Sequence, residues 1–265
     1  MLTAYITHPD CLLHDMGAHH PESPDRLRAI DDQLIANGVM AFLLHAEAPL
    51  AEHDQLARVH ASRYLDLLEQ SSPAHGLHHL DPDTAMTPHT LQAARRAAGG
   101  VIKAVDLVMA KDAPNAFCAV RPPGHHAESR KAMGFCFYNN VAVGVSHALA
   151  RYGLQRVAVI DFDVHHGNGT EDIFQDNGKV LMVSIFQHPF YPYSGDEPKG
   201  KNMLNVPLKA GTRGDGFRQA VTEQWLPALD AFRPQMIFIS AGFDAHLEDD
   251  MGSLGLVEAD YAWVT

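Results

Sequence analysis

The chain has 265 residues, of which 46% are hydrophobic and 20% are charged, a balance typical of a soluble globular protein and not of a disordered one. Asp and Glu outnumber Lys and Arg by 32 to 20, and the resulting net charge of −12 disfavours sequence-independent binding to nucleic acid. Apolar runs such as residues 236–243 are far shorter than the roughly 20 residues of a membrane-spanning helix, so we expect no membrane partner.

The compartment is predicted from the N-terminus and from cysteine usage. No basic segment followed by an apolar one opens the chain, so no signal peptide is visible. Cys11, Cys118 and Cys136 are odd in number and show no C-x-x-C spacing, which favours the reducing cytoplasm. No internal repeat or long linker divides the sequence, and we therefore predict a single domain over residues 1–265.

Several short segments are apolar throughout, as expected of strands buried on both faces of a parallel sheet. In chain order they are Ala4–Thr7, Ala116–Val120, Val157–Phe162, Val180–Phe186 and Met236–Ser240.

Segments with helical spacing of apolar residues lie between these strands. The first follows Ser23, a typical N-cap, has Pro24 at its first helical position and stops at Gly38. In the second, the pair Gly99-Gly100 weakens the middle. The predicted helices are Pro24–Asn37, Thr87–Ala110, Asn139–Tyr152 and Asp215–Phe232, and the stretch Ser71–His89 is predicted to be a loop.

Alternation of strands and helices predicts an α/β fold with a mainly parallel central sheet. In such sheets, ligand sites lie beyond the carboxyl ends of the strands.

Polar residues follow three of the predicted strands directly. Val157–Phe162 leads into Asp161-Phe-Asp163-Val-His165, Met236–Ser240 leads to Asp244, and Ala116–Val120 leads to His125-His126. Because side chains alternate along an extended chain, Asp161, Asp163 and His165 point to one side. With Asp244 they form a mixed carboxylate and imidazole set. Two Asp and one His with an open position suit a catalytic zinc ion.

Each of these residues also has an ordinary structural explanation. An Asp at a strand end is often the N-cap of the next helix, a His-His pair is often structural, and Gly167 and Gly169 fit a turn. Three polar clusters at strand ends are harder to explain in this way, because burying several carboxylates without a cation is costly.

Four motifs together resemble the histone deacetylase superfamily in order and spacing. They are R-P-P-G-H-H-A (121–127), G-F-C-F-Y-N-N (134–140), D-F-D-V-H-H-G-N-G-T (161–170) and A-G-F-D-A-H (241–246). Asn168 and the stretch Phe190-Tyr-Pro192 resemble the class II and acetylpolyamine-amidohydrolase branches. The resemblance implies the arginase/deacetylase-like three-layer fold.

The resemblance also implies roles for individual residues. Asp163, His165 and Asp244 would be the zinc ligands, and whether iron can replace zinc stays open. His126 would be the general base and His125 would act mainly electrostatically. Asp161 would orient His125, and Asn168 would orient His126.

The same resemblance implies a substrate channel and a second cation site. Gly134 would lie against the substrate amide, and the rings of Phe135 and Tyr191 would be the channel walls. A structural potassium ion would use mainly backbone oxygens of Asp161, Asp163, His165, Ser184 and Ile185.

The family pattern continues beyond Thr265, with a strand and a Gly-Gly-Tyr turn whose tyrosine donates a hydrogen bond to the developing oxyanion. The 265 residues contain no Gly-Gly-Tyr. We therefore expect a domain that is C-terminally truncated relative to the family and lacks its C-terminal strand.

The implied function is that of a zinc-dependent hydrolase acting on an acetylated lysine or an acetylpolyamine. A catalytically silent protein that binds acylated amines is the alternative, since the tyrosine is absent. An arginase-like enzyme with two manganese ions is disfavoured by the D-x-D-x-H-H order. The sequence leaves open a homo-oligomer.

Overall fold

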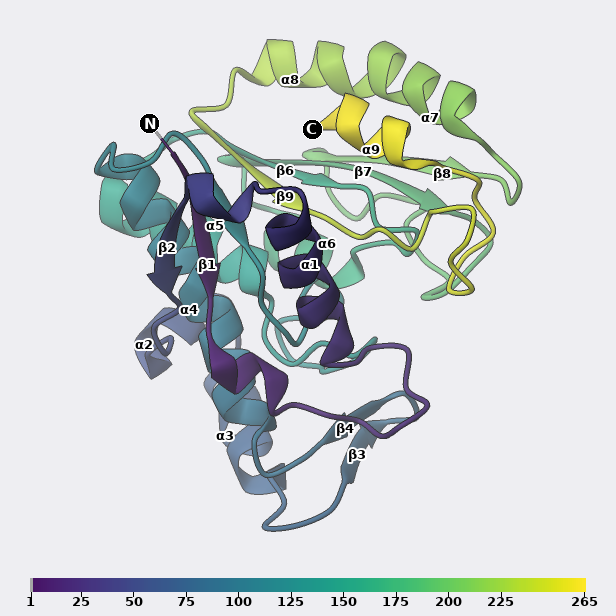
Figure 1. The fold of residues 1–265 in the computed structure, drawn as a ribbon. Helices are drawn as coiled ribbons and strands as arrows, with labels where there is room; N and C mark the ends of the chain where they lie inside the picture. Colours follow the sequence, from purple (N-terminus) through teal and green to yellow (C-terminus); the bar gives the residue numbers. More distant parts are fainter. Residues whose placement is uncertain (1) are drawn as a thin grey trace. The chain divides into compact units, whose positions relative to one another are not determined.

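The computed structural model describes residues 2–265 and divides the chain into two compact units. The first unit ends at Gly153 and the second runs from Leu154 to Thr265. Each is described by itself (Figure 1). The expectation of a single domain over the whole chain stays a prediction.

The first unit is built on a three-stranded parallel sheet with the order β2-β1-β5. Its strands are β1 (Thr3–Thr7), β2 (Leu43–Glu47) and β5 (Ala116–Cys118). Side chains of β1 alternate between two faces. Ala4 and Ile6 pack into a core cluster with Leu107, whereas Tyr5 packs with Leu27 on the opposite face.

Helices therefore cover both faces of this sheet. Leu107 belongs to α4 (Thr90–Met109) and Leu27 to α1 (Asp25–Ala36). The remaining elements of the first unit are the short helices η1 (Pro9–Leu12), η2 (Met40–Phe42) and α2 (His53–Leu56), the helices α3 (Ser62–Ser71) and α5 (Asn140–Tyr152), and the strands β3 (His78–Asp81) and β4 (Thr84–Met86).

The second unit contains a four-stranded parallel sheet with the order β8-β7-β6-β9. Its strands are β6 (Val157–Asp161), β7 (Val180–Gln187), β8 (Met203–Leu208) and β9 (Met236–Ser240). Every residue of β7 is buried, as its continuous apolar sequence predicts. Asp161, the last residue of β6, is in register with Ser184 of β7 and Ser240 of β9.

Helical segments complete the second unit. A continuous helical stretch is formed by α7 (Gly214–Ala220), a π-helical turn η3 (Val221–Trp225) and α8 (Leu226–Phe232). Phe217 and Trp225 of this stretch pack with β-strand residues such as Val183 in the main core cluster. The other two helices are α6 (Asn168–Phe174) and α9 (Glu258–Val264).

These sheets confirm the predicted α/β class, and the five predicted strands and four predicted helices are present with small shifts at their ends. One expected cap is wrong: Pro24 is the N-cap of α1, and no side-chain hydrogen bond from Ser23 caps the helix. The stretch Ser71–His89 is not a plain loop either, because β3 and β4 form an antiparallel hairpin within it. Finally, β5 belongs to the sheet of β1 and β2, so it does not share a sheet with β6 and β9.

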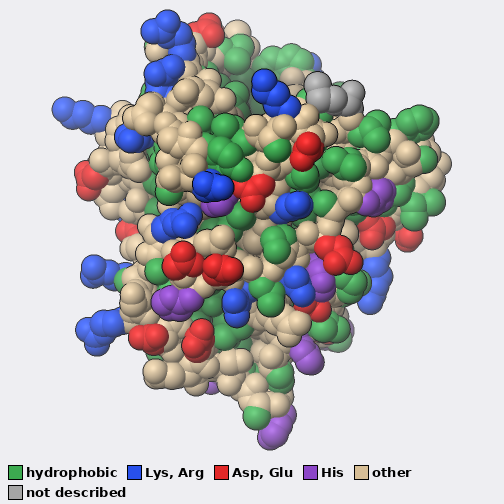
Figure 2. All heavy atoms as spheres, turned by 90° about the vertical axis from the view of Figure 1, so that its left-hand side faces the viewer, with side chains coloured by type: hydrophobic (Ala, Val, Ile, Leu, Met, Phe, Trp, Pro, Cys, Tyr) green, Lys and Arg blue, Asp and Glu red, His purple; other side chains and the backbone are tan. Residues whose placement is uncertain are grey.

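Charged side chains of both signs are interspersed on the face drawn in Figure 2, where no single sign gathers into a broad field. Within residues 2–265, no helix is both long enough and apolar enough to cross a membrane.

Candidate functional site

The strand ends of the second unit bring two carboxylates and one imidazole together. Asp163 and His165 follow β6, and Asp244 follows the neighbouring strand β9. One ligand atom from each of the three lies within 4.8 Å of the others. His165 Nδ1 is 3.0 Å from Asp163 Oδ1 and 3.0 Å from Asp244 Oδ2. The structure thus assembles the three residues that the sequence predicted as metal ligands.

Backbone hydrogen bonds fix the orientation of both carboxylates. The backbone N–H of His165 donates to Asp163 Oδ1 over 2.8 Å, and the N–H of Val164 donates to Asp244 Oδ1 over 2.9 Å. Gly242 is needed beside them, since a Cβ at this position would lie 2.1 Å from Asp163 Oδ2. The segment after β6 therefore donates hydrogen bonds to both carboxylates, and Gly242 after β9 leaves room for one of them.

The electrostatics of the cluster favour a bound cation. Burial and the charge of Asp163 raise the pKa of Asp244 to about 6. Burial alone lowers the pKa of His165, but its hydrogen bonds to the two carboxylates outweigh burial and raise that pKa to about 10. Two crowded carboxylates are relieved by a positive charge between them, and a metal ion that takes N and O ligands can supply it.

Asp161 and Asn168 lie close to the cluster in sequence but are not part of it. Asp161 is buried, and its Oδ1 accepts a hydrogen bond of 3.1 Å from the backbone N–H of Asp163. Asn168 is the buried first residue of α6. Of the predicted potassium site, the structure places Ser184 and Ile185 on β7, with Ser184 opposite Asp161.

Two aromatic rings from the loop after β7 pack against the imidazole of His165. The ring of Tyr191, a predicted channel wall, lies 5.9 Å from the His165 ring at 80°. Phe190 stacks on the same imidazole, with 5.4 Å between ring centroids and an interplanar angle of 17°. The sequence analysis gave Phe190 no role, although it is adjacent to Tyr191.

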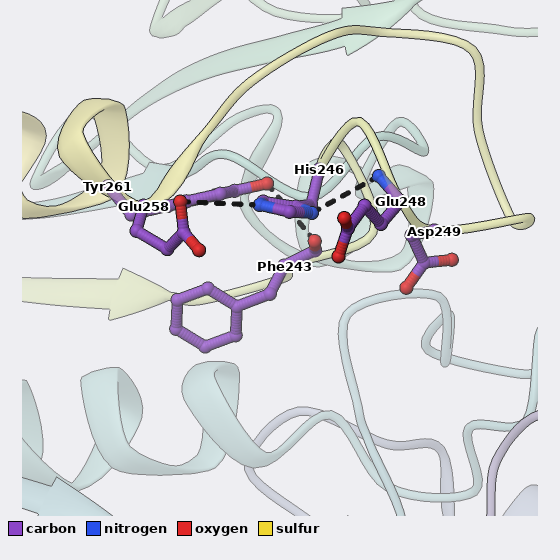
Figure 3. A pocket seen from close by; sticks show the side chains of 6 residues that line it. All are labelled: Phe243, His246, Glu248, Asp249, Glu258 and Tyr261. Atoms are coloured by element: carbon purple, nitrogen blue, oxygen red, sulfur yellow. Dashed lines mark hydrogen bonds and ion pairs between the residues drawn. The ribbon is translucent and has the colours of Figure 1, made fainter.

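A pocket of about 330 Å³ lies next to this cluster, in the second unit (Figure 3). His246 lies between two glutamates. Its Nε2 is 3.8 Å from Glu258 Oε2, and its Nδ1 accepts a hydrogen bond of 3.2 Å from the backbone N–H of Glu248. The hydroxyl of Tyr261 donates a hydrogen bond of 3.1 Å to the carbonyl oxygen of Phe243, the residue before Asp244. Burial and the charges of Asp244 and Asp163 raise the pKa of this tyrosine. The full lining is Phe243, His246, Glu248, Asp249, Glu258 and Tyr261.

The predicted tandem histidines and two channel residues belong to the first unit. His125 and His126 are both buried, with 4.0 Å between their ring centroids. A Cβ on Gly134 would lie 2.3 Å from His126 Cδ2, so this glycine allows the backbone to pass against the imidazole. The next residue is Phe135, which is half-buried and contacts the ring of His20.

A buried ion pair supports the segment that carries the tandem histidines. Arg121 is fully buried and binds Glu22 through two nitrogens, with Nη2 2.6 Å from Glu22 Oε2. Its Nη1 donates to the carbonyl oxygens of Cys11 and His14. This pair joins the segment around Glu22 to the motif at residues 121–127.

Comparison with known proteins identifies the family of the chain. The family model described as the histone deacetylase domain matches residues 20–265. A histone deacetylase-like amidohydrolase of Pseudomonas aeruginosa is 40% identical, over 96% of this chain and 73% of that protein. A probable deacetylase of Archaeoglobus fulgidus is 37% identical, over 99% of this chain and 74% of that protein.

The fold agrees as well. The crystal structure of the HDA15 HD domain superposes with a TM-score of 0.93 at 35% identity, covering all of this chain and 79% of that one. The chain belongs to the histone deacetylase family of hydrolases.

Proposed function

We propose that this protein is a zinc-dependent hydrolase that removes an acetyl group from an acetylated primary amine, either a lysine side chain or a polyamine. The observation that carries the proposal is the convergence of Asp163, His165 and Asp244 within 4.8 Å. Family membership supports deacetylation, and the donor set supports zinc, which binds N and O ligands and keeps an open position in catalytic sites.

Asp163, His165 and Asp244 would hold the metal. When bound there, zinc supplies a Lewis acid for the amide carbonyl and for the attacking water. His126 accepts a proton from that water at its imidazole, and His125 stabilises the developing charge beside it. The proton then passes to the nitrogen of the departing amine, so that acetate and a primary amine are released.

The remaining roles are positioning roles. Asp161 orients His125, and Asn168 orients His126. Because Asn168 is an uncharged amide, it cannot stabilise a positive charge on the His126 imidazole as a carboxylate would. Gly134, Phe135 and Tyr191 border the substrate, and iron remains an alternative metal. A potassium ion at Asp161, Ser184 and their neighbours, a cytoplasmic location and the oligomeric state stay predictions.

The metal assignment is tested by zinc content. Wild-type protein dialysed against zinc is expected to retain close to one ion per chain, and Asp163→Ala and Asp244→Ala are each expected to retain almost none. The matched control is Asp230→Ala, which removes an exposed carboxylate of α8 in the same unit. Stoichiometric zinc in both cluster variants would overturn the assignment. Hydrolysis of a fluorogenic acetyl-lysine peptide and of acetylpolyamines by the zinc-loaded protein then tests the reaction and its substrate.

The alternative predicted from the sequence, a catalytically silent protein that binds acylated amines, is the second candidate. It predicts zinc binding and hydroxamate binding by calorimetry with no release of acetate. The two candidates are thus separated by turnover alone, measured on protein of known zinc content.

A further inference from the structure

Three segments that are far apart in the sequence meet at Phe135. The ring of His20 contacts the ring of Phe135 edge-to-face, with 4.6 Å between centroids and an angle of 79°. The β3–β4 hairpin contributes Asp83 from its turn and Thr84 from the start of β4. From the sequence, this hairpin is expected to be part of a loop, and none of its residues has a predicted role.

The hydroxyl of Thr84 joins two of these segments. It is buried, accepts a hydrogen bond of 3.0 Å from the backbone N–H of Phe135, and donates one of 2.8 Å to Asp83 Oδ1. A single hydroxyl therefore fixes the backbone of Phe135 and the carboxylate of Asp83 at once.

The backbone of Phe135 needs such a restraint. Its φ of 68° lies in the left-handed region, which bulky residues rarely adopt, and Gly134 before it has a φ of 55°. Gly134 abuts the ring of His126. Phe135 is thus held in an unfavourable conformation between His126 on one side and Thr84 on the other.

His20 is oriented from the same hairpin. Its Nδ1 accepts a hydrogen bond of 3.1 Å from the backbone N–H of Glu22, so its Nε2 carries the proton and donates to the carbonyl oxygen of Asp83 over 3.2 Å. The edge of its ring against Phe135 is therefore also set by the turn of the hairpin.

We propose that Thr84 is a positioning residue that sets the ring of Phe135 for recognition of the substrate's alkyl stem. This inference rests on the proposed function, in which Phe135 is a channel wall. A hydroxyl that served folding alone would affect stability without affecting substrate recognition, and the two roles are separable by experiment.

The test compares Thr84→Val, which loses the hydroxyl, with Thr84→Ser, which keeps it. The matched control is Thr90→Val, because the equally buried Thr90 hydroxyl bonds to His14 and Thr87 and not to Phe135. For hydrolysis of an acetyl-lysine peptide by zinc-loaded protein, we expect Thr84→Val to raise KM about 2- to 10-fold, the effect of one lost hydrogen bond, with kcat within about twofold. Thr84→Ser and Thr90→Val keep the wild-type KM.

Amide hydrogen exchange at Phe135, resolved by NMR, provides a readout that needs no activity. Thr84→Val is expected to speed exchange at this amide at least tenfold, and Thr90→Val is not. An unchanged KM, an equal rise in KM for Thr90→Val, or unchanged exchange at Phe135 overturns the inference. Thr84→Ala serves if the valine variant does not fold. A wild-type protein without turnover would refute the proposed function, whereas the exchange result would still decide whether Thr84 holds Phe135.

Discussion

Gly242 shows how a residue without a side chain can constrain the proposed metal ligands. A Cβ there would lie 2.1 Å from Asp163 Oδ2 and 2.4 Å from its Cγ, so Gly242→Ala must displace this carboxylate. We expect zinc affinity to fall by about 10- to 100-fold, the usual cost of disturbing a ligand's surroundings, with little change in the overall fold. Competition with a chromogenic chelator measures the affinity.

The matched control for this prediction is Gly178→Ala. Gly178 lies in the same unit, and a Cβ there would meet no atom within 4 Å. If Gly242→Ala bound zinc as tightly as Gly178→Ala, then the carboxylate would have moved aside without cost, and the tight cradle around Asp163 would be irrelevant to binding.

His14 makes stability depend on pH in a defined window. It is fully buried, and burial lowers its pKa from 6.5 to about 4. Between these values the unfolded chain binds more protons, so stability is lost as the pH falls from about 6.5 towards 4. Between pH 7 and pH 4.5, we expect the free energy of unfolding of His14→Gln to fall by ~2–3 kcal/mol less than that of the wild type. Urea unfolding at both pH values measures the difference. Equal losses in both proteins would mean that His14 is protonated without penalty.

At the level of residues, the convergence of Asp163, His165 and Asp244 was predictable because each residue follows a strand whose sequence is recognisable. Alternation along an extended chain was the reason for expecting Asp163 and His165 on one side. The chain bends at residues 163–165, after the end of β6, and both side chains still meet Asp244, which follows the neighbouring strand. Thr84 and Phe190 were missed, since their contacts depend on loops whose course no periodicity predicts.

At the level of elements, the strands with mainly apolar sequences were predicted, and two edge strands with mixed sequences were missed. β1, β6 and β7 are largely apolar and lie inside or next to the middle of their sheets. β2 and β8 stand at sheet edges, and their sequences LLHAE and MLNVPL mix polar residues or proline into the run. The other two edge strands, β5 and β9, were predicted because their sequences AFC and MIFIS are mainly apolar.

The glycine pair in α4 was expected to weaken the helix, but in the structure it allows close packing. The helix runs unbroken through both Gly99 and Gly100. A Cβ on Gly99 would lie 1.9 Å from the carbonyl oxygen of Pro49. The helix thus forgoes some propensity in order to let the backbone around Pro49 approach closely.

At the level of the whole molecule, all three proposed metal ligands belong to the second unit. Metal binding should therefore stabilise that unit first. At a free zinc concentration about 100 times Kd, binding stabilises the folded unit by ~2.7 kcal/mol. This stabilisation slows hydrogen exchange of the core amides of β6 and β7 about 100-fold. Core amides of β1 should change much less. Hydrogen-exchange mass spectrometry measures both, with Asp163→Ala as the control that should not respond. Equal slowing in both units would instead mean that residues 2–265 open together, as a single domain would.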